Sequence, residues 1–322
     1  MLNNVNLILS KVQVTLKKRQ LLPKKSRVLI AVSGGQDSLC LAKILSQLQK
    51  KWDWSLAIAH CDHQWESDEG IADHVEKFAL NLQLPFYLKT AENLKETENA
   101  ARKWRYQALI EIAKEQNFKY IVTAHTKSDR AETFLYNLIR GAGSDGLRSM
   151  NWQRELETDI YLVRPLLEIT RPETLQFCEL LNLPIWEDVY NQNLKYARNR
   201  IRQELIPYLK EHFNVKIEEH LTQTAELLKE DVEYLEIMGK ELLERALIKE
   251  ENKINRQILK TAPIALQRRA IRQYLLLKLP KMPNFQDVEK VRELINSGNH
   301  SQTDPLPSGI MAIVEGEWII FL

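Results

Sequence analysis

Six consecutive residues near the start of the chain have the side chains expected of a loop that binds an anion. They follow a short apolar run and precede a helix-length segment: Ser33, Gly34, Gly35, Gln36, Asp37 and Ser38. The glycines let the backbone approach a ligand, amide groups at a helix start point at an anion, and the serines add hydroxyl donors. Asp37 fits such a loop only if Mg²⁺ lies between its carboxylate and the ligand's phosphates. The alternative is a serine-capped turn with no ligand; the Gly-Lys-Ser/Thr ending of a Walker A loop is absent.

A second group of polar residues follows a later apolar run. His125, Asp129 and Glu132 are spaced by four and three residues, which places them on one face of a helix. A histidine and two carboxylates on one face can hold Mg²⁺, bind an ammonium group or move a proton. Arg105, early in a preceding helix-length segment, is a candidate for neutralising the charge of a phosphate. The plainer interpretations are a polar helix start and a surface arginine.

Basic residues gather locally, although the net charge of +2 is too small to indicate a nucleic-acid-binding protein by itself. Within residues 191–205, Arg198 and Arg202 are four residues apart and share a helix face, whereas Arg200 points elsewhere. We interpret these three as RNA-binding residues. A second basic cluster lies in the C-terminal part of the chain, and we interpret its residues as RNA-binding too: Arg268, Arg269 and Arg272. A solvated basic helix is the alternative in both places.

The elements that must position these side chains alternate through the first half of the chain. Short apolar runs rich in β-branched residues occur at 28–32, 56–60, 86–89, 120–124 and 160–163. Helix-length segments lie between them at 38–50, 69–82, 99–116 and 128–139. This alternation predicts an α/β fold with a doubly wound parallel sheet. Ligands bind such sheets at the carboxyl ends of the strands, where the loop at Ser33 and the polar residues after Ala124 lie.

The pattern changes after Pro207, and a length of 322 residues suits two domains. A long helical pattern runs over 217–249, shorter helices are expected at 257–260, 263–279 and 285–296, and the chain ends in a hairpin at 310–314 and 318–321. We therefore predict a catalytic domain with the anion-binding loop at 1–216 and a smaller, mainly helical domain at 217–322.

Several classes of protein are disfavoured. No apolar stretch reaches 18 residues, and no basic head precedes the first apolar run, so neither a membrane span nor a signal peptide is expected. Cys40, Cys61 and Cys178 form no CxxC pair, which favours buried thiols in a cytoplasmic protein over a zinc or iron–sulfur site.

The Ser33–Ser38 run resembles the SGGxDS loop of the ATP pyrophosphatases, which cleave ATP to AMP and pyrophosphate. Its order with HxDH (60–63), ARxxRY (101–106) and TAHxxxDxAET (123–133) resembles the tRNA(Ile)-lysidine synthetase family. Further matches lie at 137–150, 164–167 and 187–209, so the resemblance is dense over 26–210 and loose over 217–322. The family usually has a second His, an Asp and a Gln where this chain has Thr126, Ser128 and Arg130. Gln64, Trp65 and Glu66 also depart from its pattern, which often has an arginine there.

The resemblance implies a PP-loop fold and a reaction in which ATP adenylates the C2 oxygen of the wobble cytidine of an isoleucine tRNA with a CAU anticodon. Free L-lysine then displaces AMP and gives lysidine. ATP would be bound by the six loop residues and His60, and Mg²⁺ by Asp37 and Asp129. The catalytic residues would include the two Mg²⁺ ligands and three others: Asp37, Arg105, His125, Asp129 and Glu132. The resemblance also suggests a homodimer.

Two other interpretations stay open at this stage. Another ATP pyrophosphatase is the first, but a tRNA thiolase would need paired cysteines, and an NAD synthetase would not need the basic run at 191–205. An inactive tRNA-binding protein is the second, and Asp37, Asp129 and Arg105 argue against it.

Overall fold

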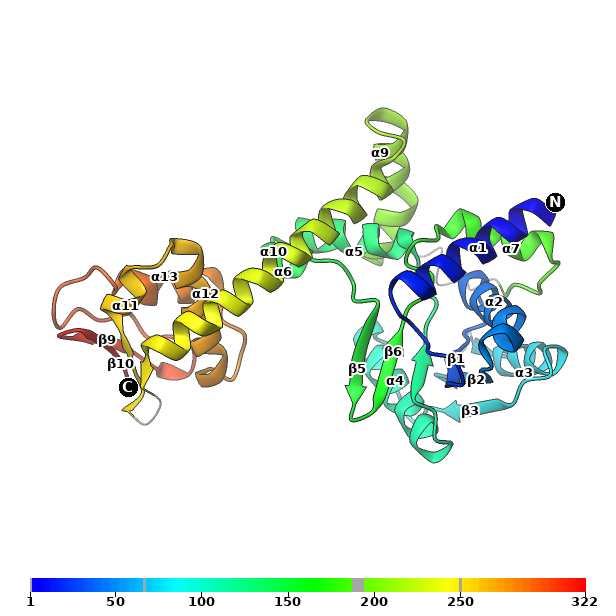
Figure 1. Cartoon of the computed structure of the whole chain (residues 1–322), viewed down its shortest axis with the longest axis horizontal. Helices are drawn as coiled ribbons and strands as arrows, with labels where there is room; N and C mark the ends of the chain where they lie inside the picture. The colour runs from blue at the N-terminus through cyan, green and yellow to red at the C-terminus, as the bar shows by residue number, and fades with distance from the viewer. Residues whose placement is uncertain (1, 66–67, 187–193, 249–250) are drawn as a thin grey trace. The chain divides into compact units, whose positions relative to one another are not determined.

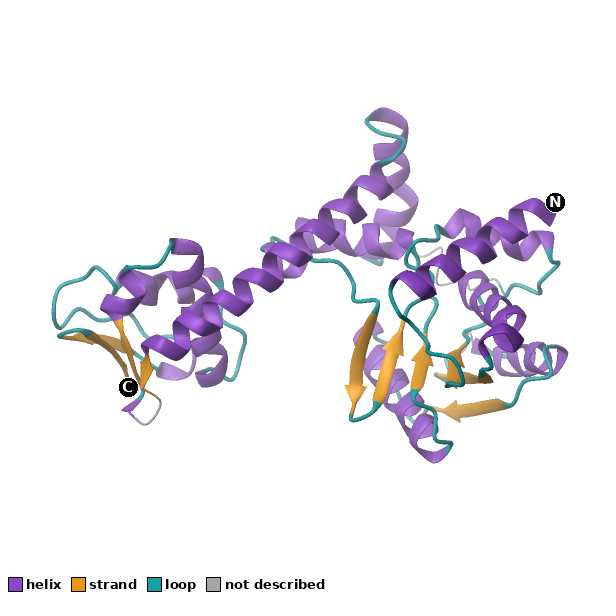
Figure 2. Ribbon diagram, in the orientation of Figure 1, coloured by secondary structure: helices purple, strands orange, loops and turns teal. Residues whose placement is uncertain are grey.

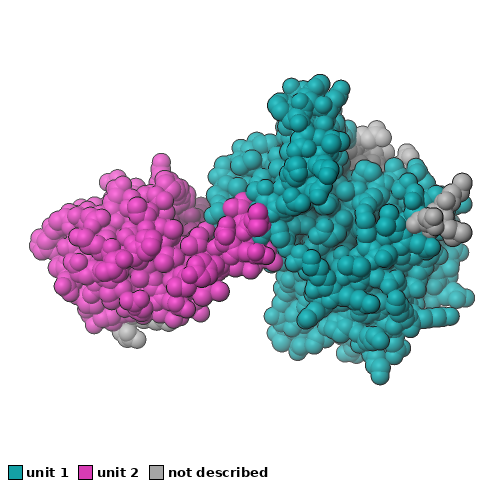
Figure 3. All heavy atoms as spheres, turned by 45° about the horizontal axis from the view of Figure 1, so that its top comes forward, with its two compact units in different colours: residues 1–226 teal, residues 227–322 magenta. Residues whose placement is uncertain are grey.

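The computed structural model describes residues 2–65, 68–186, 194–248 and 251–322. The chain divides into two compact units, residues 1–226 and residues 227–322, coloured teal and magenta in Figure 3. Each unit has its own sheet and its own apolar core. No helix of the described residues is long and apolar enough to cross a membrane.

The first unit is built on a six-stranded sheet in the order β3-β2-β1-β4-β6-β5 (Figures 1 and 2). The strands are β1 (Arg27–Ala31), β2 (Ser55–Asp62), β3 (Phe86–Thr90), β4 (Tyr120–Val122), β5 (Gln153–Glu157) and β6 (Ile160–Val163). Five of them pair in parallel, and β5 pairs antiparallel with β6. The predicted doubly wound sheet is confirmed. Its strand order reverses between β1 and β4, which is where such sheets bind ligands.

Strand β5 is the part of this sheet that the sequence pattern does not predict. Its residues read Gln-Arg-Glu-Leu-Glu and are mostly exposed. Charged side chains suit an edge strand, because they discourage pairing with another chain. Strands are predicted from runs of apolar residues, and a segment with so few of them gives no such signal.

Helices cover both faces of the sheet, and β1 shows how one strand serves both. Val28 and Ile30 are fully buried in one core, whereas Leu29 is fully buried in the other, because successive side chains point to opposite faces. The first core includes residues of α1 (Leu2–Lys18), α2 (Gln36–Trp52), α3 (Ile71–Asn81) and α7 (Arg171–Leu180). The second is covered by α4 (Glu98–Glu115).

The remaining helices of this unit follow β4 or precede the second unit. They are α5 (Lys127–Ile139), α6 (Ser144–Leu147), α8 (Ala197–Arg200), a π-helix (Ile201–Leu205), α9 (Ile206–His212) and the start of α10 (Ile217–Ala246). Ile201 and Ile206 pack against Ala131 and Leu135 of α5. This small core fixes the π-helix against α5. Helix α10 begins at residue 217 as predicted, but it ends at Ala246 instead of 249, because residues 247–248 form strand β7.

The second unit combines helices with a four-stranded antiparallel sheet in the order β7-β8-β10-β9. Its strands are β7 (Leu247–Ile248), β8 (Lys253–Asn255), β9 (Ala312–Glu315) and β10 (Trp318–Phe321), and its helices are α11 (Arg256–Lys260), α12 (Ile264–Lys278) and α13 (Phe285–Glu293). The predicted terminal hairpin is β9–β10. Strands β7 and β8 are too short to be seen in the sequence. A Cβ at Gly239 would lie 2.5 Å from the Cβ of Arg269, so α10 and α12 approach closely at this glycine.

Candidate active site

The Ser33–Ser38 loop lies between β1 and α2, as predicted. Gly34 has a φ of +86°, and a Cβ there would lie 3.3 Å from both Ile71 and Trp186, so both conformation and space require glycine. The Ser38 hydroxyl accepts a hydrogen bond from the Ser33 amide at 3.2 Å and donates to the Gly35 carbonyl at 2.8 Å. Gly35 caps α2 without a side chain, which leaves the first amide groups of the helix for a ligand.

Asp37 faces α7, an element that sequence reasoning did not connect with the site. Its carboxylate accepts hydrogen bonds from the Thr174 hydroxyl at 2.5 Å and from Nη1 of Arg171 at 3.2 Å. Burial raises the pKa of Asp37, Arg171 opposes this rise, and the charge of Asp129 adds to it. Gln36 also turns to α7, since its Nε2 donates to the Arg171 carbonyl at 2.9 Å and to Thr174 at 3.0 Å. A Thr-Arg-Pro-Glu capping box just after β6 is the sequence signal that could have identified α7.

Asp129 and Glu132 converge on one face of α5, and Arg202 of the π-helix joins them. Arg202 donates to Asp129 at 3.3 Å through Nη2, and to Glu132 at 2.6 Å through Nε and 2.8 Å through Nη2. Thr126 caps α5, and its amide and hydroxyl donate to the other Asp129 oxygen at 2.7 and 2.8 Å. Burial raises the pKa of Glu132, which is 3% exposed, and Arg202 offsets part of this rise.

His125 lies just before α5, with its Nδ1 at 3.0 Å from the Thr123 hydroxyl. Burial and the guanidinium of Arg164 lower the pKa of His125 to about 3, with smaller contributions from Arg105 and Arg102. The imidazole is therefore neutral at physiological pH. Arg105 thus acts on His125 through its charge, although it is not among the residues that line the adjoining pocket.

His60 is buried near the end of β2 rather than directed into an open site. Its Nδ1 lies 2.8 Å from the Val32 carbonyl, and its side chain is 5% exposed. Burial lowers the pKa of His60, which makes the neutral form the stable one. This contact fixes the segment that leads into the Ser33 loop. Direct binding of ATP by His60 stays a prediction.

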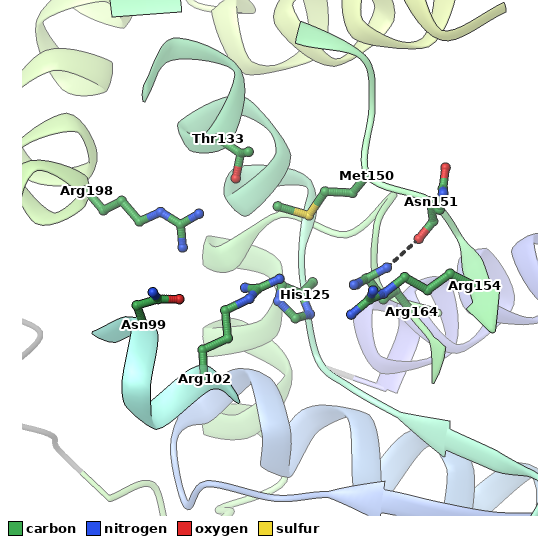
Figure 4. Close-up of a pocket in the computed structure, with 9 residues that line it drawn as sticks. All are labelled: Asn99, Arg102, His125, Thr133, Met150, Asn151, Arg154, Arg164 and Arg198. Atoms are coloured by element: carbon green, nitrogen blue, oxygen red, sulfur yellow. Dashed lines mark hydrogen bonds between the residues drawn. The ribbon is translucent and has the colours of Figure 1, made fainter. Parts of the chain in front are cut away.

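Beyond His125 lies a cavity of about 420 Å³. Its lining residues are Asn99, Arg102, His125, Thr133, Met150, Asn151, Arg154, Arg164 and Arg198 (Figure 4). Arg198 was predicted from its place in the basic run. Arg154 and Arg164 were not proposed as site residues: Arg154 lies on the unpredicted edge strand, and Arg164 directly follows β6. A search of the carboxyl end of β6 would have found Arg164.

The three departures from the family pattern all have structural partners. Thr126 is the N-cap of α5, and the Ser128 hydroxyl accepts a hydrogen bond from the Arg171 amide at 3.2 Å. Arg130 is 5% exposed and donates to Ser149 and, at 2.9 Å, to Glu226 of α10. None of the three replaces Asp129 or Glu132 on the face that meets Arg202. These residues support α5 instead.

The other predicted RNA-binding arginines lie in different surroundings. Arg200 lines a second, more apolar pocket of about 540 Å³. In the second unit, Arg268 forms an ion pair with Glu289 at 2.7 Å, and Arg269, 9% exposed, forms one with Glu236 at 2.7 Å. Arg272 lies 3.5 Å from the same Glu236. All three arginines therefore have an acidic partner within this unit, and contact with RNA stays a prediction. The acidic part of the 187–209 match, at 187–193, lies outside the described residues, as does Glu66.

The residues predicted to hold Mg²⁺ are compatible with it. Asp37 and Asp129 supply hard carboxylate oxygens, and the charge of Asp129 raises the pKa of Asp37, a repulsion that a cation between them would remove. No group of three or more His, Cys, Asp or Glu gathers to hold a metal within the described ranges. Mg²⁺ at nucleotide sites commonly takes one or two carboxylates and completes its shell with phosphate and water oxygens. Two carboxylates therefore fit this ion when phosphates are present.

Comparisons with known families agree with the two units. A model of the PP-loop domain matches residues 8–209, and a model of the TilS-like substrate binding domain matches residues 248–321. A protein of Nostoc sp. named tRNA(Ile)-lysidine synthase is 55% identical over 321 residues, covering 95% of this chain and 94% of its own. A protein of the same name from Synechocystis sp. is 49% identical, with 98% of each chain covered.

Among solved structures, the U34-tRNA thiolase from Methanococcus maripaludis has a similar fold. It superposes with a TM-score of 0.60 at 19% identity, covering 70% of this chain and 80% of the thiolase. At this identity the likeness concerns the fold alone.

Proposed function

The chain belongs to the tRNA(Ile)-lysidine synthase family, and we propose that it joins free lysine to C2 of the wobble cytidine in an isoleucine tRNA with a CAU anticodon. It is a ligase with an ATP-binding PP-loop domain. The base and the amino acid follow from membership of this family, and the roles of single residues follow from the arrangement of the candidate site. Full-length identity of 55% to a relative of this name is the observation that carries it most strongly.

In the first step, the C2 oxygen of the cytosine attacks the α-phosphorus of ATP, and pyrophosphate leaves. The Ser33–Ser38 loop and the start of α2 would bind the departing pyrophosphate, because their amide groups are aimed at an anion. Asp37 and Asp129 would hold Mg²⁺, which would neutralise negative charge on the phosphates. Arg171 and Thr174 keep the Asp37 carboxylate in one orientation through their hydrogen bonds.

In the second step, the ε-amine of lysine attacks C2, the C2–O bond breaks, and AMP leaves with the oxygen. The ammonium group must first lose a proton. Glu132 is a better acceptor than an ordinary carboxylate because burial raises its pKa, whereas His125, with a pKa of about 3, is a weaker base than an ordinary imidazole. We therefore propose that Asp129 and Glu132 bind the lysine ammonium, and that Glu132 receives the proton.

The second unit supports the assignment of tRNA as the substrate, since residues 248–321 match a substrate-binding domain of this family. We expect the protein in the cytoplasm, where tRNA, ATP and lysine meet. Assembly as a homodimer stays a prediction from the family resemblance.

A labelling experiment tests the proposed function. The protein is incubated with ATP, Mg²⁺, radiolabelled lysine and total tRNA, and the labelled tRNA is identified by hybridisation. Label should enter only the CAU isoleucine tRNA, and pyrophosphate should appear in equal amount. An isoleucine tRNA with a GAU anticodon is the matched control. Folded protein that binds tRNA but transfers no lysine would overturn the proposal.

A further inference from the structure

The cavity next to His125 has the composition of an anion-binding pocket and lies apart from the loop that binds pyrophosphate. Its residues come from α4, from the segments that follow β4 and β6, from the edge strand β5 with the residues just before it, and from α8, which supplies Arg198. Figure 4 shows the guanidinium of Arg102 beside the His125 imidazole, with Arg154 and Arg164 on its other side. The pocket therefore lies between His125 of the candidate active site and the edge strand β5.

Two arginines that line the pocket, Arg102 and Arg154, lie against one aromatic ring behind the lining, that of Tyr106. The guanidinium of Arg102 lies 5.4 Å from the centroid of the Tyr106 ring, and that of Arg154 lies 5.3 Å from it. None of the described lining residues is acidic. Arg102 and Arg164 also lower the pKa of Tyr106, although burial alone would raise it. Like charges repel at such distances, so an anion would stabilise this arrangement.

Arg164 gives independent evidence that a ligand belongs here. Its side chain is 4% exposed, and Nη1 donates to the Asn151 carbonyl at 2.7 Å. Its Nε is buried and makes no hydrogen bond of good geometry in the described part of the chain, although the Tyr106 hydroxyl lies beside this guanidinium. A buried donor without an acceptor costs roughly 1–3 kcal/mol, and native proteins rarely keep one without a reason. An oxygen of a bound anion would satisfy it.

We propose that this pocket binds a backbone phosphodiester of the tRNA strand next to the cytidine that reacts. The inference rests on the proposed function, because it takes tRNA as the substrate. A cavity of about 420 Å³ holds a nucleotide with its phosphate and is larger than a lysine carboxylate requires. Arg154 lies on an exposed edge strand, so a continuous RNA strand can enter from that side. The pyrophosphate of ATP has its own loop at Ser33–Ser38.

Guanidinium groups suit this role because they donate two parallel hydrogen bonds to phosphate oxygens. Contacts of this kind fix the register of the strand without reading its sequence. A target base must leave its stack before its C2 oxygen can reach ATP, and a phosphate held on the strand would keep the base in place after it has flipped. Arg102, Arg154 and Arg164 are therefore assigned as binding residues that position the tRNA.

The first test changes Arg154, whose exposure makes the substitution compatible with folding. Arg154→Gln should weaken tRNA binding by about tenfold and reduce the slope of log Kd against log salt concentration by about one. The KM values for ATP and lysine should stay within about twofold of the wild type. Arg27→Gln is the matched control: Arg27 is an exposed arginine at the amino end of β1, and its loss should leave tRNA affinity unchanged.

The second test removes the phosphate charge instead of the arginine. tRNA is assembled with a neutral methylphosphonate at single positions on either side of the wobble cytidine. At one position the modified tRNA should bind the wild type about tenfold more weakly than normal tRNA does. The Arg154→Gln variant should bind the modified and the normal tRNA with nearly equal affinity, because the two changes remove the same contact. Fully additive losses at every position would contradict the proposal.

Other results assign the pocket differently. A rise in the KM for lysine alone would mean that it holds the lysine carboxylate, and a rise in the KM for ATP alone would mean that it holds ATP phosphates. Either result would contradict the proposal that the pocket binds a phosphodiester. Unchanged KM values for ATP and lysine together with an unchanged tRNA affinity would also contradict it. Failure of the proposed function is separable, since it appears as absent lysine transfer in the wild type, whose tRNA affinity and salt slope are measured independently.

Discussion

Asp37, which is half-buried, and Glu132, which is buried, are two carboxylates of one site, but they meet different partners. Asp37 lies in the first turn of α2, next to the amide groups that face pyrophosphate, and Glu132 lies on α5 under the guanidinium of Arg202. Hydrogen bonds from Thr174 and Arg171 of α7 hold Asp37, and hydrogen bonds from Arg202 hold Glu132, while burial raises the pKa of both carboxyl groups. We therefore propose Asp37 for the ATP step and Glu132 for the lysine step.

Substitution of each carboxylate by its amide separates the two steps. Asp37→Asn should reduce tRNA-dependent pyrophosphate release by about 100-fold or more, because the oxygen charge that would hold Mg²⁺ is lost. Glu132→Gln should allow pyrophosphate release but reduce lysine transfer by about 100-fold, because no group accepts the proton. Each variant is the control for the other, with tRNA binding measured in both. Equal loss of both steps in Glu132→Gln would contradict the assignment.

His125 predicts a specific dependence of stability on pH. Its pKa of about 3 in the folded protein lies below the value of about 6.5 expected for an unfolded chain. Between these values only the unfolded state takes up the proton, so stability falls as pH decreases through this window. Lowering the pH from 7 to 5 should therefore cost the wild type about 2 kcal/mol through this residue. The groups that face it are Arg164, Asp129, Arg105 and Arg102.

Urea unfolding at pH 7 and pH 5 measures this effect. His125→Gln should lose about 2 kcal/mol less than the wild type over the same change of pH. His220→Gln, which removes an exposed imidazole, should lose as much as the wild type. The same loss in His125→Gln as in the wild type would show that His125 is not held neutral.

At the scale of helices and strands, periodicity predicted the parallel sheet and the face of α5, because both depend on local spacing. Asp129 and Glu132 share a face for that reason, and the Ser33–Ser38 loop was recognisable from residue types alone. The partners of these residues could not be predicted. Thr174 meets Asp37 across 137 positions and Arg202 meets Glu132 across 70, and such contacts arise only from tertiary packing.

Arg130 shows how a departure in sequence becomes a support between elements. It follows Asp129 directly, yet on α5 it points to Ser149 and to Glu226 of α10 instead of Arg202. The structure shows a buried ion pair between α5 and the start of α10, because adjacent helical residues face different directions.

A substitution of Arg202 tests how much its ion pair with Glu132 stabilises the contact between the π-helix and α5. Arg202→Gln should lower the free energy of unfolding by about 3 kcal/mol, because it leaves the buried Glu132 carboxylate without its partner. Loss of this positive charge should also raise the pKa of Glu132, so the acid limb of the pH–rate profile for lysine transfer should move to higher pH. Exposed Arg200, on the preceding turn, is the matched control, and Arg200→Gln should change stability by no more than about 0.5 kcal/mol. An unmoved acid limb in a folded Arg202→Gln variant would argue for a purely structural role.

At the scale of the whole molecule, the candidate catalytic residues all belong to the unit of residues 1–226, and the second basic cluster belongs to the unit of residues 227–322. Sequence reasoning read that cluster as a surface for RNA, because local charge is visible in a sequence while ion pairing is not. In the folded unit, Glu289 and Glu236 neutralise Arg268 and Arg269. A charge-reversal variant would therefore confuse loss of RNA contact with loss of folding.

Paired substitutions at Arg268 and Glu289 remove this ambiguity. Arg268 is partly exposed, and its ion pair with Glu289 lies near the surface, so Arg268→Gln should cost no more than about 1 kcal/mol of stability. If Arg268 contacts tRNA, as the sequence predicts, Arg268→Gln should raise the KM for tRNA about tenfold and leave that for ATP unchanged. Adding Glu289→Gln should restore the balance of charge but not the affinity, because a glutamine cannot replace a guanidinium on a phosphate. Recovery of wild-type affinity in the double variant would instead mean that Arg268 only neutralises Glu289, and the tRNA surface of this unit would have to be sought elsewhere.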